Sequence, residues 1–445
     1  MARCSTARTT LALVLVALAS ASPARAQPGP VRLTLAEAIA RGYETSHRLA
    51  ELGARRDSST AAIGIARSGD RPQVAALGGY SRTNHVDEFA ILQPGAGLRV
   101  IYPDVPDNWR SRLDLQWLVY TGGRVDALVR AASAEAEAAD HDVAAGRTDL
   151  RFEVTRAYWA VVTAREAVRV VEEALGRVEA QLSDARARLR TGLVPPSDVT
   201  QAEARHALQR TLLVEAQNLV ETSALELRRL TGIPHETPVE PVEPLVAPPA
   251  AIADVPALLD EARRQRSDRA ALDARVTAAG ARTDAAAAGK RPVVAVGGGV
   301  DLARPNPKIF PREDTWQESW DVGVNASWTL FDGGRVRAEV ATSDAARRAS
   351  EERLAEFDTR LEAEVRQRRI DLETARAALV SAREAVRSAT EAHRVLRNRY
   401  TAGVATSTEV LDAQVVQLQS ELDETRALAS ARLAQAQLER AVGRQ

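Results

Sequence analysis

Cysteine is almost absent from this sequence, because the one cysteine among its 445 residues is Cys4. The rest of the chain can therefore form neither a disulfide bond nor a cysteine metal site. Neither sign of charge is in excess, since 59 basic residues face 60 acidic ones. A chain without a basic field is not expected to bind nucleic acid in bulk. Beyond the N-terminus, no stretch approaches the roughly 18 consecutive apolar residues of a transmembrane helix.

Catalytic motifs are also missing. The sequence has no GxxxxGK[ST] phosphate loop, so the chain is not expected to energise transport itself. Its six histidines show no metal-ligand spacing such as HExxH, and no Ser/His/Asp arrangement has local support. We therefore expect a protein that is not an enzyme and that holds no cofactor and no metal.

The N-terminal 26 residues are typical of a secretory signal peptide. Arg3 and Arg8 provide the positive region, 11–19 is a short apolar run, and 24–26 (ARA) is a small-x-small cleavage site. The mature chain is then expected to begin at Gln27. An uncleaved membrane anchor is the alternative, but the run is short for a spanning helix.

The sequence contains one pattern twice. A tryptophan followed by LVYTGGRV recurs 211 residues later, followed by TLFDGGRV, and two later glycines in each half keep the same offset. The matched pairs are Trp117 and Trp328, Gly192 and Gly403, and Gly232 and Gly443. A constant offset over more than a hundred residues indicates a duplicated module.

The two copies are joined by a proline-rich segment, 234–256, which holds seven of the 20 prolines and is predicted to be an extended linker. Each copy is predicted to contain a helix, a β-hairpin, a very long helix, a tip turn and a second helix. The first repeat, 27–233, has its first helix at 34–70, its hairpin at about 73–120, its long helix at about 124–190 and its last helix at 197–230. The second repeat, 257–445, has them at 257–290, about 292–331, about 335–400 and 408–441.

The long helices are predicted from composition, since 124–190 and 335–399 lack proline and are rich in Ala, Glu, Arg, Val and Leu. Each would run about 100 Å. In the last helix, apolar residues follow a 4-3-4 seam that predicts close packing. These residues are Leu411, Val415, Leu418, Leu422 and Ala429. An ordinary soluble coiled coil would show the same seam.

Eleven of the 17 aromatic residues fall in two windows, 80–120 and 310–331, and these windows also hold the predicted strands. Apolar and polar residues alternate from 320 to 330, which suits a transmembrane strand with one greasy face. Aromatic residues at the strand ends suit a membrane interface. They are Trp117, Tyr120, Trp328 and Phe331. The loops between the strands, 83–110 and 302–318, are long and polar.

Two hairpins give four strands, which cannot close a barrel, and open sheet edges are not tolerated in lipid. The chain must therefore oligomerise if it spans a membrane. Two ordinary hairpins packed on a soluble body are the alternative.

Taken together, the signal peptide, the duplicated module, the paired GGR turns and the R-x-x-x-G tip turns resemble the TolC-like outer-membrane efflux protein family. The resemblance covers the chain from about Leu33 (LTLAEAIA) to Gly443. It implies a mainly α-helical homotrimer in which each protomer gives four strands to one 12-stranded membrane β-barrel. The barrel would continue into a long periplasmic α-helical barrel.

The function that this resemblance implies is a passive exit duct in the outer membrane. The implied partners are outer-membrane lipid, a periplasmic adaptor (membrane fusion protein) and an inner-membrane transporter of the RND, ABC or MFS type. Tripartite efflux and type I secretion are not separable from the sequence, and neither are drug, metal and protein cargoes. A periplasmic coiled-coil adaptor or scaffold protein is the alternative, although it leaves the aromatic hairpins and the duplication unexplained.

The resemblance also assigns positions. The strand–helix turns are Gly122, Gly123, Gly333 and Gly334, and the adaptor-contacting tips are Gly192, Leu193, Val194, Gly403 and Val404. The tip glycines have a local reason, because a helix-to-helix turn needs a left-handed residue after the first helix. Ser197 and Thr408 are predicted to be the N-caps of the helices that follow.

The family's periplasmic mouth lies at these tips. Glu409 and Asp412 are three residues apart and share one helical face, so three copies would place six carboxylates around a cation-favouring constriction. Asp198 and Tyr400 match residues that link the tips in the closed state. Two departures from the pattern stand beside them: Ala405 occupies the place of a basic partner, and Pro195-Pro196 stiffens the first tip.

Overall fold

The computed structural model describes residues 29–95, 97–249 and 253–444. The predicted signal peptide, 1–26, lies outside the described residues. Among the helices of the described ranges, none carries an 18-residue window apolar enough to cross a membrane.

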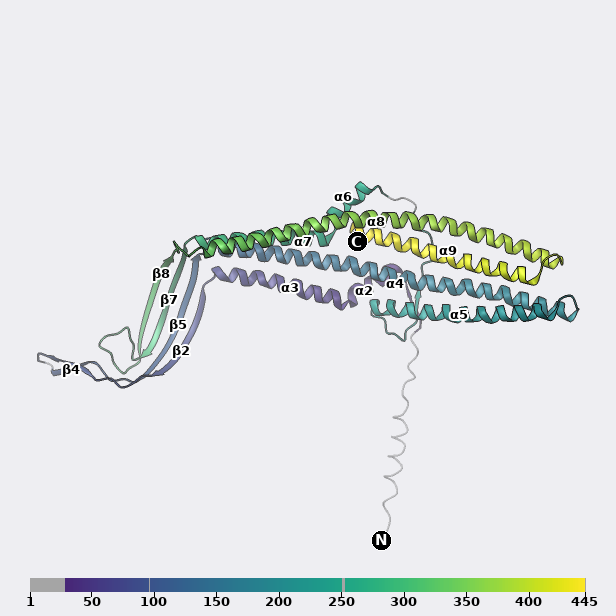
Figure 1. Ribbon diagram of the computed structural model, residues 1–445. Coiled ribbons are helices and arrows are strands. Elements are labelled where there is room, and N and C mark those ends of the chain that lie inside the picture. The colour runs from purple at the N-terminus through teal and green to yellow at the C-terminus, as the bar shows by residue number, and fades with distance from the viewer. Residues whose placement is uncertain (1–28, 96, 250–252, 445) are drawn as a thin grey trace, which may run out of the picture. The chain divides into compact units, whose positions relative to one another are not determined.

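The two repeats fold into the same series of elements (Figure 1), and matching helices have equal lengths of 11, 21, 67 and 36 residues. The first series is α2 (Leu35–Thr45), α3 (His47–Arg67), β2 (Gln73–Arg82), β5 (Asp107–Tyr120), α4 (Arg124–Arg190) and α5 (Pro196–Thr231). The second is α6 (Val255–Gln265), α7 (Ser267–Ala287), β7 (Val293–Arg304), β8 (Gln317–Ser327), α8 (Arg335–Thr401) and α9 (Ser407–Val442). Short 3-10 turns, η1 (Ser68–Asp70) and η2 (Ala288–Lys290), end α3 and α7.

The structure corrects the prediction that 34–70 and 257–290 are single helices. The backbone is extended at Ser46, between α2 and α3, and at Arg266, between α6 and α7. Each break therefore divides the segment into a helix of 11 residues and one of 21. Neither break falls at a proline or a glycine, which are the strongest sequence signals for the end of a helix.

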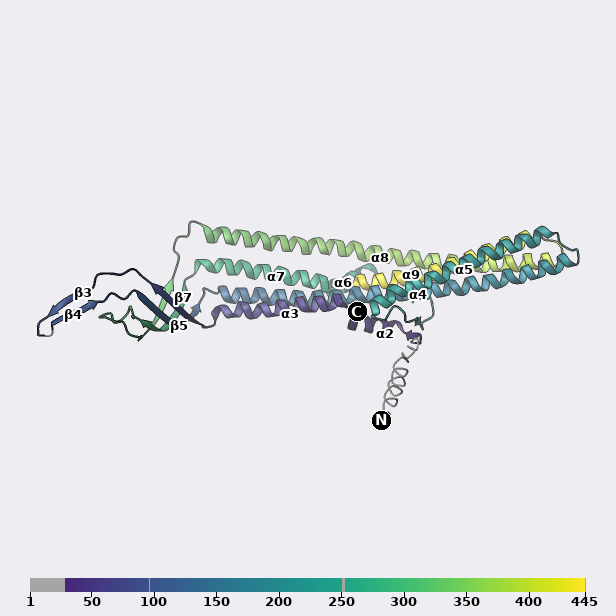
Figure 2. The same ribbon diagram turned by 90° about the horizontal axis from the view of Figure 1, so that it is seen from below.

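The four long strands form one antiparallel sheet in the order β2-β5-β7-β8. The segment 83–110, predicted to be a loop, contains a separate hairpin of β3 (Phe89–Gln93) and β4 (Gly97–Tyr102), visible beyond the sheet in Figure 2. β8 ends at Ser327, so Trp328 and Phe331 follow the strand instead of ending it. Trp117 and Tyr120 lie among the last four residues of β5.

The chain divides into two compact units that do not coincide with the repeats. The first unit comprises the residues up to Ser46, Leu150–Pro249 and Leu372–Ala436. The second unit comprises His47–Asp149, the described residues from 253 to Asp371, and the C-terminal segment from Gln437. Both repeats contribute to each unit. The long helices α4 and α8 pass through both.

The core of the first unit is built around Tyr158 of α4, which is completely buried. Its hydroxyl donates to the carbonyl of Leu33 at 3.1 Å and accepts from the N–H of Glu243 at 3.2 Å. Further along, Leu418 of α9 packs with Val170, Val171 and Ala174 of α4 in a buried apolar cluster. The predicted seam is wrong at Val415, which is 36% exposed, because the buried face of α9 runs through the neighbouring Gln414 and Gln417.

The proline-rich linker is held in place rather than free. Its strand β6 (Val239–Pro241) pairs in parallel with β1 (Val31–Leu33). Four arginines of the same unit donate to linker carbonyl groups, at Thr237, Val239, Val246 and Pro249. The donors are Arg165, Arg228, Arg376 and Arg432. Since the prolines of this segment have no N–H to donate, arginine side chains supply donors to these four carbonyls. α6 begins at Val255, so the last two predicted linker residues belong to that helix.

Candidate functional site

The two tip turns have the same backbone geometry. Gly192 and Gly403 adopt positive φ angles of 73° and 75°. In the first turn the N–H of Leu193 bonds to the carbonyl of Arg188 at 2.9 Å, and in the second that of Val404 bonds to Arg399 at 2.9 Å. These are the bonds of a helix that ends on a left-handed glycine. The two repeats therefore share the same hydrogen bonds at their tip turns.

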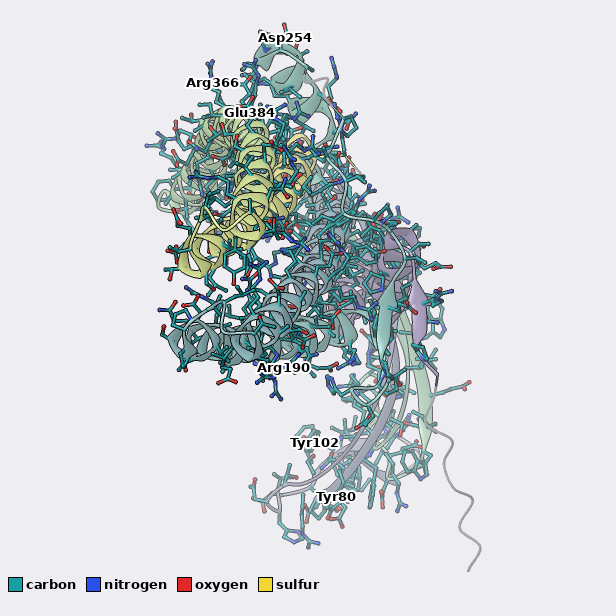
Figure 3. All side chains as sticks on the ribbon, turned by 90° about the vertical axis from the view of Figure 1, so that its right-hand side faces the viewer. Tyr80, Tyr102, Arg190, Asp254, Arg366 and Glu384 are labelled. Atoms are coloured by element: carbon teal, nitrogen blue, oxygen red, sulfur yellow. The ribbon has the colours of Figure 1, made fainter. Side chains whose placement is uncertain are left out.

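The tips are apolar and exposed. The side chains of Leu193 and Val404 are 74% and 63% exposed, while Val194 is partly buried. Figure 3 shows Arg190, the last residue of α4, on the surface beside the first turn.

The helix N-caps differ from those predicted. α9 begins at Ser407, and the residue before it, Thr406, forms a capping box with Glu409. The N–H and hydroxyl of Thr406 donate to the Glu409 carboxylate at 2.7 and 2.9 Å, and the N–H of Glu409 donates back to the hydroxyl at 3.3 Å. α5 has Pro195 in the N-cap position with no side-chain bond. Thr408 and Ser197 are therefore not N-caps, because each helix begins one or two residues earlier than the prediction assumed.

The two acids proposed for the mouth have different surroundings. The bonds from Thr406, first from its backbone N–H and then from its hydroxyl, hold the pKa of Glu409 below its ordinary value. Asp412 lies 3.6 Å from Arg205 of α5, and its side chain is 68% exposed. The Glu409 carboxylate is therefore ionised at neutral pH, and both acids are open to solvent within one protomer. Arg205 is a basic neighbour that the sequence interpretation missed, because it lies 207 residues before Asp412.

The second tip also contacts the first through neutral groups. The hydroxyl of Thr408 donates to Oε1 of Gln201 at 2.9 Å. This bond joins the first turn of α9 to α5, next to the pair of Asp412 and Arg205. The tips are thus connected by two exposed polar contacts.

Tyr400 is buried at the end of α8, with 4% of its surface exposed. The guanidinium of Arg188 lies 4.6 Å from the centre of its ring and donates to its carbonyl at 3.4 Å. Burial raises the pKa of Tyr400, and the negative charges of Asp184 and Asp198 add to the rise. Arg188 is the cationic neighbour of Tyr400, held by Asp184 at 3.0 Å. The predicted link between Tyr400 and Asp198 stays a prediction.

A second polar constellation lies on one face of the sheet. The carboxylate of Asp301 in β7 is 3% exposed and accepts from Arg110 and Arg112 of β5, both at 2.7 Å. Arg112 also reaches Asp321 of β8 at 2.8 Å, and Lys308 of the β7–β8 connection pairs with both aspartates. The sequence pattern concealed this cluster, because each residue alone is an ordinary polar position of an alternating strand.

The sheet and the helices are joined by glycine turns. Gly122, Gly123, Gly333 and Gly334 all have positive φ, between 66° and 91°. Gly122 has a second requirement, since an added Cβ would lie 2.7 Å from Cβ of Arg291. Nη1 of Arg291 donates to the carbonyl of Gly122 at 2.8 Å.

The duplicated tryptophans make duplicated bonds. Nε1 of Trp117 donates to the carbonyl of Asp70 at 2.6 Å, and Nε1 of Trp328 to that of Lys290 at 3.0 Å. Each bond ties the end of a long strand, or the residue after it, to the preceding 3-10 turn. The rings remain exposed, as do those of Tyr120 and Phe331, so they are available to an apolar environment.

Within the described ranges, no cluster of three or more His, Cys, Asp or Glu residues has the geometry to hold a metal ion.

The chain resembles known proteins over nearly its whole length. The sequence profile described as outer membrane efflux protein matches residues 38–233 and 258–444, one match for each repeat. Protein CyaE of Bordetella pertussis is 29% identical over 390 residues, covering 86% of this chain and 78% of the relative. Outer membrane protein TolC of Vibrio cholerae is 25% identical over 384 residues, covering 85% and 83%. Among solved structures, CusC superposes with a TM-score of 0.77 at 16% identity, covering 94% of this chain and 95% of that one.

Proposed function

The chain belongs to the outer membrane efflux protein family, and from this premise we propose how its parts form an outer-membrane exit duct. In this proposal three protomers assemble, their sheets closing into one barrel and their helices into one periplasmic tube. The tube receives substrates from an inner-membrane transporter through a periplasmic adaptor, and the duct conducts them passively. The family assignment favours this function over that of a periplasmic adaptor.

The observation that carries the proposal is the incomplete sheet of the protomer. β2 and β8 are edge strands, each paired on one side only among the described residues. One sheet face carries exposed apolar side chains, among them Trp320, Val322 and Val324 at 70–74% exposure, while the charged cluster lies on the other. Edge strands with free N–H and C=O groups cannot stay open in lipid. Copies of the chain would pair these edges, with the charged face turned inward.

Membrane fractionation followed by gel mobility of the unheated, detergent-extracted protein tests the assembly. We expect recovery in the outer membrane as a particle of three times the protomer mass that converts to monomer on heating. A soluble periplasmic monomer would overturn the proposal.

The mouth is proposed to lie at the tips, with Glu409 and Asp412 setting its preference for cations. Both acids are exposed, and the pKa of Glu409 is lowered, which supports this role. We expect Asp412→Asn to lower the cation preference of the conducting trimer, measured as a reversal potential across a salt gradient. Asp423→Asn is the matched control, since Asp423 is an exposed acid on the same helix, paired with Arg426 at 2.9 Å. Equal effects of both variants would argue against a special role for Asp412.

The tips are also proposed to dock the periplasmic adaptor. Leu193 and Val404 are exposed apolar side chains at the two tip turns, which is typical of contact positions. We expect Leu193→Arg to weaken cross-linking to the adaptor while the trimer stays intact. Phe310→Arg, at a residue with 75% exposure in the β7–β8 connection, serves as the control. Unchanged cross-linking of the Leu193 variant would exclude this contact.

A further inference from the structure

A polar cavity of about 520 Å³ lies between α4, α8 and α9 in the first unit. Four of the side chains that line it are less than a tenth exposed: Gln181, His393, Tyr400 and Gln414. Within the described part of the chain, Nε2 of Gln181, Nε2 of His393, Oε1 of Gln414 and Nε of Arg177 are buried polar atoms without a protein partner. A cavity of this size and polarity is suited to water. These helices therefore meet across a wet, polar surface at this level.

His393 of α8 is the titratable group of this cavity. Its Nδ1 lies 2.7 Å from Oε1 of Gln417 on α9. The amide nitrogen of Gln417 donates to Glu421 at 2.8 Å, and Glu421 accepts from Arg177 of α4 at 2.7 Å. Because the Gln417 amide nitrogen is already used as a donor, its oxygen faces the histidine, and Nδ1 must carry the hydrogen. Nε2 of neutral His393 then has a free lone pair, so a proton added to the ring goes to Nε2.

The charges around His393 come from all three helices. Arg177 of α4 and Arg397 of α8 oppose a positive histidine, and Glu421 of α9 favours one. Two further acids of α4 line the cavity, but each is paired with an arginine of its own helix, Glu173 with Arg169 and Asp184 with Arg188. Burial acts most strongly and, together with the two arginines, lowers the pKa of His393 from its ordinary value of 6.5, against the bond to Gln417 and the charge of Glu421, which both act to raise it.

We propose that His393 is a proton-controlled latch that holds α8 and α9 against α4 while it is neutral and releases them when it is protonated. In the closed packing, the neutral ring completes the chain from Gln417 through Glu421 to Arg177. Protonation places a third positive charge beside Arg177 and Arg397. Opening the packing exposes the ring to water and relieves that repulsion.

The direction and size of the effect follow from linkage. Since the closed packing lowers the proton affinity of His393, the stabilisation is complete above about pH 6.5 and is lost as the pH falls through the lowered pKa. If the open state has an ordinary histidine, the opening equilibrium rises by at most about tenfold between pH 7.5 and pH 5.5.

Hydrogen-exchange mass spectrometry on the intact, detergent-extracted protein measures this opening. After correction for intrinsic exchange rates, we expect amides of 389–401 and 407–421 to exchange severalfold, up to about tenfold, faster at pH 5.5 than at pH 7.5. In His393→Gln, the corrected exchange rates at the two pH values should be equal. His206→Gln is the control and should leave the pH dependence of exchange unchanged. His206 lies in the same unit but pairs with Glu179 at 3.3 Å and does not line the cavity.

A second variant keeps the test decisive if His393→Gln disturbs packing. Arg397 is exposed, and Arg397→Gln removes one positive charge near the ring. The acceleration at pH 5.5 should then be smaller than in the unmodified protein, because the closed packing lowers the proton affinity of His393 by less. An absent acceleration, or one that persists unchanged in His393→Gln, would overturn the latch. Hydrogen exchange reports the packing of the helices and not conduction. A negative result would therefore overturn the latch but not the duct function, and the latch can be tested even in a protein that does not conduct.

Discussion

Glu409 has two possible roles at the mouth, and substitutions can separate them. Its carboxylate closes the capping box of α9, and its charge is proposed to select cations. Glu409→Gln removes the charge but keeps an oxygen that can accept from Thr406, since glutamine also serves in capping boxes. Thr406→Ala removes the capping hydroxyl and leaves the charge in place. The pair therefore distinguishes charge from structure.

The expected magnitudes differ in the two assays. Loss of a threonine N-cap costs about 1 kcal/mol, so Thr406→Ala should increase local opening of the first turn of α9 about fivefold. A unit charge about 10 Å from a permeating ion contributes ~0.4 kcal/mol in water, or ~1.2 kcal/mol for three copies. Since the same three charges disfavour an anion by ~1.2 kcal/mol, Glu409→Gln should reduce the cation-to-anion permeability ratio by the equivalent of ~2.4 kcal/mol, roughly fiftyfold, at low salt, and by less at high salt.

The measurements are reversal potentials of the trimer in planar bilayers and hydrogen exchange of 406–412. The pH dependence adds a check, since the bonds from Thr406 hold the pKa of Glu409 below 4.5. A lowered pKa means that both the charge and the capping stabilisation persist above pH 4.5 and are lost as the pH falls through the lowered value. The contribution of Glu409 to selectivity, measured as the difference between the unmodified trimer and Glu409→Gln, should thus be constant from pH 7 to pH 5.

One result would refute this reasoning directly. If Glu409→Gln leaves the reversal potential unchanged while Thr406→Ala alters it, Glu409 acts through the helix start and not through its charge. The Glu409 carboxylate would then serve only to cap α9, and selectivity would have to come from Asp412 or from another part of the duct.

Two further predictions concern stability. Gly299→Ala should lower the temperature at which the trimer dissociates, measured on gels of samples heated to increasing temperatures. The added Cβ would lie 2.7 Å from Nη2 of Arg112 and 2.8 Å from the carbonyl oxygen of Leu113. Gly323→Ala, with open space around the added Cβ, is the control on the same sheet, and equal shifts would contradict the clash. Tyr158→Phe should cost about 1–3 kcal/mol, because the N–H of Glu243 loses its partner and the Leu33 carbonyl keeps only its bond from the N–H of Val242 at 3.1 Å. Hydrogen exchange around β1 measures that loss, and unchanged protection would show that other groups replace the hydroxyl.

Much of the architecture is local and could be predicted from the sequence. Long proline-free stretches of good helix formers predict α4 and α8 because helix propensity accumulates along the chain. Glycines such as Gly192 and Gly403 mark turns, because a left-handed backbone is strained for other residues. Duplication then doubles each signal, and the equal helix lengths confirm it.

The partnerships depend on tertiary packing. Arg188 beside Tyr400, His393 beside Gln417, and Asp301 between Arg110 and Arg112 join different helices or strands, and most of these pairs are far apart in the sequence. A charged or polar residue at an exposed helical position has the same local pattern whether it meets water or a partner. The sequence by itself therefore determined the long helices, the four long strands, their order and the family, because these follow from local pattern and repetition. Only the tertiary structure decided which face of α9 is buried, which arginine meets each acid and where a histidine loses water, because burial depends on the packing of elements distant in the chain.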